Sequence, residues 1–212
     1  MLAVPTPTHG GSPEAVRGAS RRLAREALCA ALARELGCAA QDIAISDCRG
    51  GAPRAHAGEP ALAARLAAIG LSISHTPGLS LAAWHFGGAV GVDVQAVDDV
   101  AAIAPEELDR LARLYLGPDS WPNRPPDLAD KAPAAIDLIV CAQHWAAHEA
   151  RLKCLGEPLQ EWSPALGARL AGTLARPLRW PHTDSGAAPT NRTWIGAVAW
   201  RSPGGTAPRI SA

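Results

Sequence analysis

The sequence predicts an α+β protein made of two related halves. A segment over about 13–36 repeats Leu and Ala at the 3.6-residue spacing of an amphipathic helix, and a second helix pattern runs from about 134 to 155. Strand-rich segments follow each helix, with apolar residues that alternate. The two helices end alike, as REALCAALARELG and HWAAHEARLKCLG. Two α+β halves of about 100 residues each would produce this echo, although an Ala-rich chain can also produce it by chance.

Composition and charge exclude several classes of protein. The chain has 212 residues, with 20 basic and 20 acidic side chains and 48% hydrophobic residues, as in a globular protein. Because the charges balance, there is no electrostatic footprint for nucleic-acid binding. No uncharged apolar stretch reaches the roughly 20 residues that cross a bilayer, so we expect no membrane partner.

Cysteine usage indicates a cytoplasmic protein. The five cysteines form no CxxC pair, and an odd number suits a disulfide framework poorly. The first residues lack the basic and apolar regions of a signal peptide. We therefore expect reduced thiols and a cytoplasmic location.

The N-terminal half is predicted to span residues 15–100, after a loose segment over 1–14 that holds three prolines. In its last strand, valines alternate with Gly91, Asp93 and Gln95, so one face is apolar and the other presents a carboxylate and an amide. The elements expected in this half are a helix over 13–36, a short helix over 60–69, and strands over 42–46, 71–74, 79–86 and 90–97.

The C-terminal half is predicted to span residues 101–212. A helix over 105–116 has proline at its first turn, and the segment 117–133, with five prolines, is expected to be irregular. The other elements expected are a helix over 134–155, strands over 165–172 and 194–202, and a polar turn region over 181–193.

Three segments in order carry a resemblance to a known family: LSISHTPG, GVDVQAV and WAAHEARLKCLG. They resemble the signature of the 4′-phosphopantetheinyl transferases of the single-chain, surfactin-synthetase-activator type. That signature has a Ser-His turn, a Gly-[Ile/Val]-Asp-[Ile/Val]-Glu strand and a Trp-x-x-Lys-Glu-Ala-x-x-Lys helix. The loop GGAPR is similar to the family's Gly-Lys-Pro loop, and RLYLGPDS to its Arg-Phe-Phe-Ser-Pro-x-Glu segment. The resemblance covers roughly residues 15–175.

The resemblance implies a fold and an activity. Family members consist of two pseudo-symmetric α+β halves with the active site in the cleft between them. With Mg²⁺, they move the phosphopantetheine arm of coenzyme A onto a serine of an acyl or peptidyl carrier protein and release 3′,5′-ADP. The single-chain type is monomeric. We expect the carrier protein to dock near the Pro-rich segment 117–133.

The resemblance also assigns catalytic and metal-binding residues. Mg²⁺ keeps octahedral oxygen ligation and takes one or two protein carboxylates; these would be Asp93 and Glu149, with Gln95 at the position of the family's second strand acid. Glu149 would also act as general base toward the carrier serine. Lys153 would meet a phosphate as a point charge.

Coenzyme A binding is assigned to the N-terminal half and to the same lysine, Lys153. Ser74 and His75 match the Ser-His turn, which holds a coenzyme phosphate in the family. Basic residues are expected near the 3′-phosphate, and Arg17 and Arg49 align approximately with them. Further basic residues in these regions are Arg21, Arg22, Arg25 and Arg54.

Three positions depart from the family pattern, each by loss of a charge. Gln95 replaces an acid, His148 replaces the first lysine of the helix motif, and Ala52 replaces the loop lysine. Around a polyanion, such losses imply weaker coenzyme binding, a different substrate or decay of activity. We expect the activity to survive, and we expect a lysine at position 148 to lower the KM for coenzyme A.

Each of these residues also fits a plainer role when taken alone. Asp93 could be an exposed strand carboxylate, and His75 a turn residue. Glu149 and Lys153 could be a solvated i,i+4 pair that contributes about 0.2–0.5 kcal/mol.

Two alternative functions remain open at this stage. One is a catalytically weakened or inactive relative that binds coenzyme A or a carrier protein. The other is a zinc hydrolase, because His144 and His148 lie one helical turn apart and could hold Zn²⁺, although no third ligand follows them.

Overall fold

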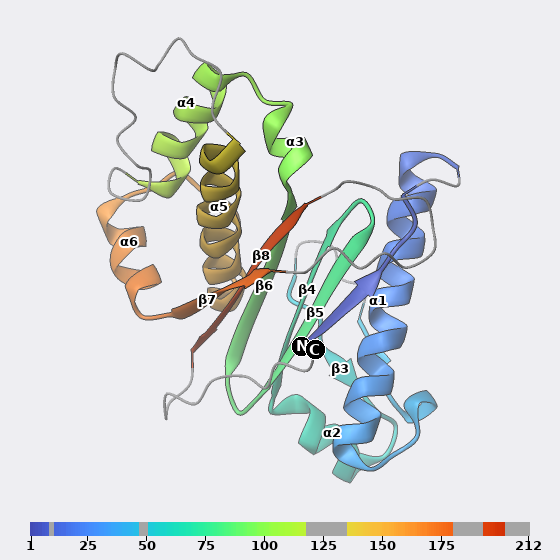
Figure 1. The fold of residues 1–212 in the computed structure, drawn as a ribbon. Helices are drawn as coiled ribbons and strands as arrows, with labels where there is room; N and C mark the ends of the chain where they lie inside the picture. The colour runs from blue at the N-terminus through green and yellow to red at the C-terminus, as the bar shows by residue number, and fades with distance from the viewer. Residues whose placement is uncertain (9–10, 47–50, 118–134, 180–192, 202–212) are drawn as a thin grey trace.

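The chain folds into a mixed α+β structure of helices and small antiparallel sheets, as the sequence predicts (Figure 1). The computed structural model describes residues 1–8, 11–46, 51–117, 135–179 and 193–201. Two three-stranded sheets lie in the middle of the molecule, with helix α1 on one side and helix α5 on the other. The predicted segment 117–133, apart from its first residue, and most of the turn region 181–193 lie outside the described residues.

The N-terminal sheet has the strand order β1-β5-β4, and all its strands are antiparallel. Helix α1 begins after Ser12, whose side chain accepts a hydrogen bond from the Ala15 backbone N–H, and it ends at Gly37 in the left-handed conformation. The elements in chain order are β1 (Leu2–Pro5), α1 (Pro13–Leu36), η1 (Ala40–Asp42), β2 (Ala44–Ile45), β3 (Ala55–His56), α2 (Pro60–Ala67), β4 (Ile69–Thr76) and β5 (Leu79–Phe86).

The C-terminal sheet has the order β6-β8-β7 and is likewise antiparallel. Helices α3 and α4 lie between β6 and α5 in the chain. The elements are β6 (Ala89–Ala96), α3 (Val97–Ala101), α4 (Pro105–Leu116), α5 (Ala135–Leu155), α6 (Pro164–Ala171), β7 (Leu174–Arg179) and β8 (Trp194–Arg201).

The two sheets belong to units with the same order of main elements: a strand, a long helix, a short helix and a hairpin. In both sheets the second hairpin strand is central and pairs with the strand that precedes the long helix. The short helices have nearly the same sequence, PALAARLA in α2 and PALGARLA in α6. Each buries two leucines one turn apart, Leu62 and Leu66 in α2 and Leu166 and Leu170 in α6. The echo in the sequence thus extends through the whole unit.

Several predicted elements need correction. Residues 2–5 are not loose but form strand β1, and Pro5 is tolerated there because β1 is at the edge of its sheet. Strand β6 pairs with β8, so it belongs with the C-terminal sheet although it lies before the predicted boundary at residue 100.

The segment 165–172, predicted as a strand, is helix α6. Ser163 caps it by accepting a hydrogen bond from the Leu166 N–H, and Pro164 occupies the first turn. Strand β7, the short strand β3 and the short helices η1 and α3 were not predicted from the sequence. The helices predicted over 13–36, 60–69, 105–116 and 134–155, and the strands over 71–74, 79–86 and 90–97, are confirmed to within a few residues at each end.

A hydrophobic core between the sheets joins the two units. The valines of β6 pack against Leu79 and Leu81 of β5, together with Val198 and Trp200 of β8. The opposite face of β6 lies directly against α5, because a Cβ atom at Gly91 would overlap the carbonyl oxygen of Ala150. A second core, which includes Leu28 and Leu32, fixes α1 on the N-terminal sheet.

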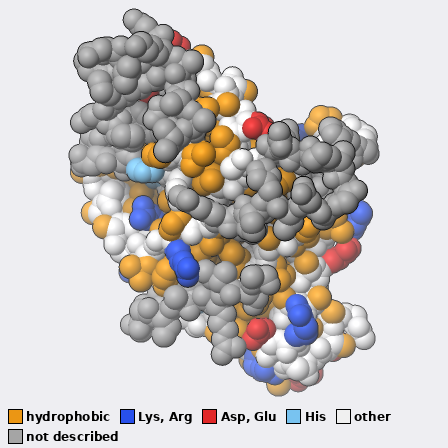
Figure 2. Space-filling view, in the orientation of Figure 1, with side chains coloured by type: hydrophobic (Ala, Val, Ile, Leu, Met, Phe, Trp, Pro, Cys, Tyr) orange, Lys and Arg blue, Asp and Glu red, His pale blue; other side chains and the backbone are white. Residues whose placement is uncertain are grey.

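Two further predictions concern membranes and thiols. Among the described residues, no helix combines the length and the apolar character required to cross a membrane. Cys29, Cys38, Cys141 and Cys154 are free thiols, which agrees with the reduced state predicted from the sequence. On the face shown in Figure 2, hydrophobic side chains gather near the middle, and the visible Lys and Arg side chains stand apart from one another.

Candidate active site

A cavity of about 800 Å³ opens between the two units. Helix α1 and the end of β4 form one wall, and β6 and α5 form the other. Its polar lining includes Arg17, Arg21, Ser74, His75, Asp93, Gln95, Glu149 and Lys153. The residues assigned from the three sequence motifs therefore lie around one space, although they are far apart in the chain.

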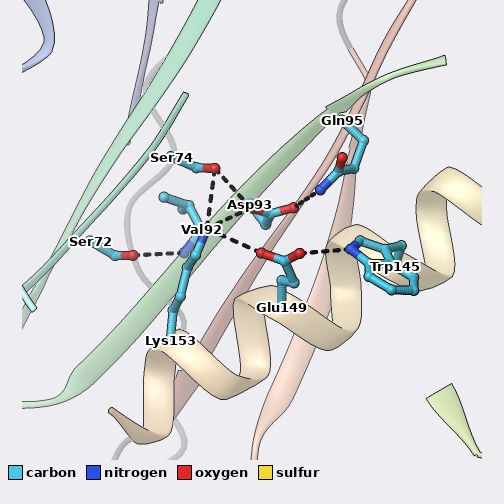
Figure 3. A network of polar contacts seen from close by, with 8 residues as sticks. All are labelled: Ser72, Ser74, Val92, Asp93, Gln95, Trp145, Glu149 and Lys153. Carbon is cyan, nitrogen blue, oxygen red and sulfur yellow. Dashed lines mark hydrogen bonds and ion pairs between the residues drawn. The ribbon is translucent and has the colours of Figure 1, made fainter. Parts of the chain in front are cut away.

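Asp93 is the most buried member of this group, with only 2% of its surface exposed. Its Oδ1 accepts a hydrogen bond from Ser74 Oγ at 2.8 Å and one from Lys153 Nζ at 2.5 Å. Its Oδ2 accepts from Gln95 Nε2 at 2.6 Å (Figure 3). The interpretation of Asp93 as an exposed strand carboxylate is therefore wrong, since the side chain is buried and both of its carboxylate oxygens have hydrogen-bond partners.

Lys153 connects the two walls of the cavity. Besides Asp93, its ammonium group donates to Ser74 Oγ at 3.2 Å and lies 3.7 Å from Glu149 Oε2. The Lys153 side chain is 33% exposed and that of Glu149 is 23% exposed. They form an i,i+4 ion pair, as the plainer interpretation holds, but the pair faces the cavity and not bulk solvent.

Glu149 is held by the tryptophan one turn earlier. Trp145 Nε1 donates to Glu149 Oε1 at 2.6 Å, and the indole ring packs edge-on against Tyr115 with ring centroids 5.7 Å apart. Burial, followed by the nearby charge of Asp93, raises the pKa of Glu149, while Lys153 and the Trp145 hydrogen bond oppose this rise. Trp145 therefore both packs against Tyr115 and holds the Glu149 carboxylate.

His75 lies at the end of β4, where Nδ1 is 2.7 Å from Ser80 Oγ. Burial, followed by the positive charges of Arg21, Lys153 and Arg25, lowers the pKa of His75 to about 4. His75 is therefore neutral at pH 7 in the free protein. Arg21, Lys153 and Arg25 thus place positive charge near His75, which suits an anionic ligand.

Two arginines of α1 line the cavity one helical turn apart, Arg17 and Arg21. Arg17 was aligned approximately from the sequence, whereas Arg21 was only one of several candidates. Ser20, between them in the chain, is buried and lines the same cavity. A small polar residue between basic ones is therefore the signal in the sequence for the face of α1 that looks inward. Arg49 lies outside the described residues.

The edges of β4 and β6 explain why the motifs meet. Ser72 Oγ accepts a hydrogen bond from the Val92 backbone N–H at 3.0 Å and so satisfies the free edge of β6. At Gly70 a Cβ atom would overlap the carbonyl oxygen of Gly88, so the backbones approach closely there. Together with the contact between Gly91 and α5, these features bring Ser74 and Asp93 into hydrogen-bond distance.

Two of the three departures from the family pattern lie elsewhere in the structure. His148 lines a separate cavity behind α5 and not the one that holds Glu149. The expectation that a lysine at position 148 would contact the coenzyme is therefore unsupported, since residues next to each other on a helix point in different directions. Ala52 lines a third cavity of about 730 Å³, which Lys153 also borders.

The alternative with zinc gains no support from the geometry. His144 and His148 do line one cavity, but Arg151 lies beside them and Glu149 does not. Within the part of the chain that the structure describes, no group of three or more His, Cys, Asp and Glu residues is arranged to hold a metal ion. A nearby guanidinium also disfavours a cation.

The two carboxylates of the candidate site fit Mg²⁺ better. Asp93 Oδ1 and Glu149 Oε2 both face the Lys153 ammonium group, so they converge on a place that now holds a positive charge. Their mutual repulsion contributes to the raised pKa of Glu149, and a divalent cation would relieve it. Two carboxylates completed by water and substrate phosphates is a usual Mg²⁺ environment. Gln95 orients Asp93 through its amide N–H group and is not itself directed at this place.

Neither the scan against protein-family models nor the search of the curated proteins finds a match. The geometry of the site and the sequence motifs are therefore the features that indicate a function.

Proposed function

We propose that the chain is a 4′-phosphopantetheinyl transferase of the single-chain, surfactin-synthetase-activator type. It transfers the arm of coenzyme A to a serine of an acyl or peptidyl carrier protein and releases 3′,5′-ADP. One observation carries the proposal: the three motifs meet at one cavity, with Asp93, Glu149 and Lys153 on one wall and Ser74 and His75 on the other. The repeated units with a cavity between them support the corresponding two-half fold.

Glu149 is suited to the general-base role. The carrier serine must lose its proton as it attacks a phosphorus of the pyrophosphate, and the best base has a pKa close to the working pH. Burial and Asp93 move the pKa of Glu149 upward, in that direction. The Trp145 hydrogen bond fixes one carboxylate oxygen and leaves the other, Oε2, directed at Lys153 and the cavity.

The positive side chains of the cavity are suited to the coenzyme phosphates. Negative charge on the phosphate oxygens must be met by fixed donors during transfer. Lys153, Arg17 and Arg21 provide such charge. A charged phosphate would thus be held from both units at the same time.

When Mg²⁺ is bound, Asp93 and Glu149 would hold it, and it would supply charge neutralisation for the pyrophosphate. Lys153 would then give up part of its contact with Asp93 and turn toward a phosphate. Since one chain supplies both walls of the site, we propose that the protein is a monomer. We also propose that it works in the cytoplasm.

Intact-mass spectrometry of apo carrier proteins tests the proposal. The carriers are incubated with the protein, coenzyme A and Mg²⁺, and a gain of one phosphopantetheine arm is expected. Glu149→Gln should abolish the gain, while Glu161→Gln, the same change at an exposed glutamate, should preserve it. Absence of the gain across several acyl and peptidyl carriers, with the protein folded, would refute the transferase.

One observation favours a second candidate, an inactive relative that only binds. Gln95 stands where the family has an acid, and it uses its amide to hold Asp93 at 2.6 Å. An acid at this position would add negative charge to a metal site, whereas the Gln95 amide donates a hydrogen bond that holds Asp93 in place. Calorimetry separates the two functions: coenzyme A binding without any mass gain on carriers would identify the binding protein.

A further inference from the structure

A second cavity, of about 550 Å³, lies behind the catalytic helix, between α5, α6 and β7. Its polar lining comes from one face of α5: Gln143, His144, His148 and Arg151. None of these residues lines the candidate active site. Its size is typical of a small-molecule site.

His148 and Arg151, on the α5 wall of this cavity, each have a buried nitrogen without a hydrogen-bond partner among the described residues. His148 is 6% exposed, and its Nε2 atom makes no hydrogen bond within the part of the chain that the structure describes. The same holds for Nε of Arg151. Buried polar atoms are almost always satisfied in native proteins, so two unpartnered nitrogens on one wall, one of them in a guanidinium that can only donate, indicate a missing polar partner.

The chemistry of these donors restricts the ligand. A guanidinium can only donate and carries a positive charge, and it matches the two oxygens of a carboxylate or phosphate. His148 Nε2 can donate to the same group. The ligand must therefore carry an anionic oxygen group on the α5 side.

The remaining lining is apolar and contains an aromatic wall. Trp162, Leu170, Ala175 and Pro177 contribute to it. The Trp162 indole is fixed in place: a Cβ atom at Gly117 would overlap the ring, and the Trp162 backbone N–H donates to the Leu114 carbonyl oxygen at 2.7 Å. A bare inorganic anion would leave this wall without a contact.

We propose that this cavity binds a small molecule that carries one carboxylate or phosphate on a flat apolar body. Arg151 and His148 hold the anionic group, and the body lies against Trp162. This site is independent of the transferase proposal, because it uses the other face of α5.

Nuclear magnetic resonance of the full chain tests the site with benzoate and phenyl phosphate as probes. The seven tryptophans give separate indole N–H signals, of which Trp162 reports this cavity and Trp145 reports the active site. Trp162→Phe and Trp145→Phe assign them. Saturable movement of the Trp162 signal with benzoate is expected, while benzamide, the neutral analogue, and inorganic phosphate should bind at least ten-fold more weakly.

Matched arginine variants locate the anion. Arg151→Met should weaken benzoate binding at least ten-fold, and Arg21→Met, the same change in the active site, should leave it unchanged. No movement of the Trp162 signal in the wild-type protein would overturn the proposal, and so would equal binding of benzamide or unchanged binding in Arg151→Met. The titrations of the wild-type protein with benzoate and benzamide use no variant of the polar wall. They therefore still decide the proposal if Arg151→Met fails to fold.

Discussion

Replacement of Glu149 by glutamine changes the candidate base while keeping its shape. The glutamine side-chain oxygen can still accept the hydrogen bond from Trp145 Nε1, which is 2.6 Å long in the present structure. The ion pair with Lys153 is lost, but a partly exposed pair at 3.7 Å contributes only about 0.2–1 kcal/mol. Loss of that pair would change a rate by about five-fold at most. Loss of a general base lowers kcat by about 10²- to 10⁴-fold, so the size of the effect distinguishes the two roles.

The pH dependence of the same variant gives an independent check. A general base must be deprotonated to act, so the acid limb of kcat/KM, measured with Mg²⁺ present, should disappear in Glu149→Gln. The contribution of Glu149 to the free energy of unfolding is fully present below pH 4.5. It is lost as the pH rises through the pKa of Glu149 in the folded protein, which is raised above 4.5. The free energy of unfolding of the wild type, relative to the variant, should therefore fall between pH 4.5 and neutrality.

The assays are phosphopantetheine transfer followed by intact mass, and urea denaturation at several pH values. Glu161→Gln serves as the control for both, since this glutamate is exposed and lies outside the cavity. A Glu149→Gln protein that retains activity within five-fold of the wild type, with the same acid limb, would refute the base role. An unchanged pH dependence of stability would show that the carboxylate is solvated.

Three further changes test other parts of the site. Gly91→Ala should lower the free energy of unfolding by about 1–3 kcal/mol in urea denaturation, because the added Cβ atom meets the α5 backbone. Gly18→Ala, in open space on α1, should raise it by about 0.5–1 kcal/mol. Equal effects of the two changes would contradict close packing at Gly91. Arg21→Met should raise the KM for coenzyme A about 10- to 100-fold, whereas Arg22→Met, at a residue that does not line the cavity, should leave this KM unchanged. Similar KM values for the two variants would exclude Arg21 from the phosphate site. Gln95→Glu should reduce stability without Mg²⁺ and increase the thermal shift that Mg²⁺ produces, and an unchanged Mg²⁺ response would count against a metal beside the buried aspartate.

The helices were predictable because their signals are local. Helix α1 has a serine cap, a proline at its start, apolar spacing and a terminal glycine, and all of these act over a few residues. Helix α6 was mistaken for a strand because its eight residues show only two leucines, which is too short a stretch to separate a period of 3.6 from a period of two. Strand β1 could not be recognised from the sequence, since its pairing with β5 joins segments about 80 residues apart in the chain.

The residues of the site were predictable from the motifs, but their environment was not. Sequence spacing placed Asp93 on the face of β6 opposite the valines, and it lies there. The sequence does not say that α5 and β4 close over that face, and this closure makes the carboxylate buried. Likewise, the identity of His148 suggests a coenzyme contact, whereas the helical angle between it and Glu149 directs it to the other cavity.

The repeated units explain why the chain has one such site and not two. When α1 is aligned on α5 by the glycines that end them, with φ of 68° and 70°, Ala30 falls at the position of Glu149 and Arg34 at that of Lys153. Strand β1, the counterpart of β6, reads LAVP and has no acid at all. The N-terminal unit therefore lacks the carboxylates, and it contributes cationic and hydroxyl groups instead.

Because acids come from one unit and arginines from the other, the site exists only where the two meet. The apolar core between β5 and β6 sets the distance between these groups, so it controls the geometry of the site as well as the stability of the fold. A polyanion bound in the cavity would contact both walls and should stabilise the junction by linkage. Loss of packing at that core should then weaken coenzyme binding without any change to a residue that contacts the ligand.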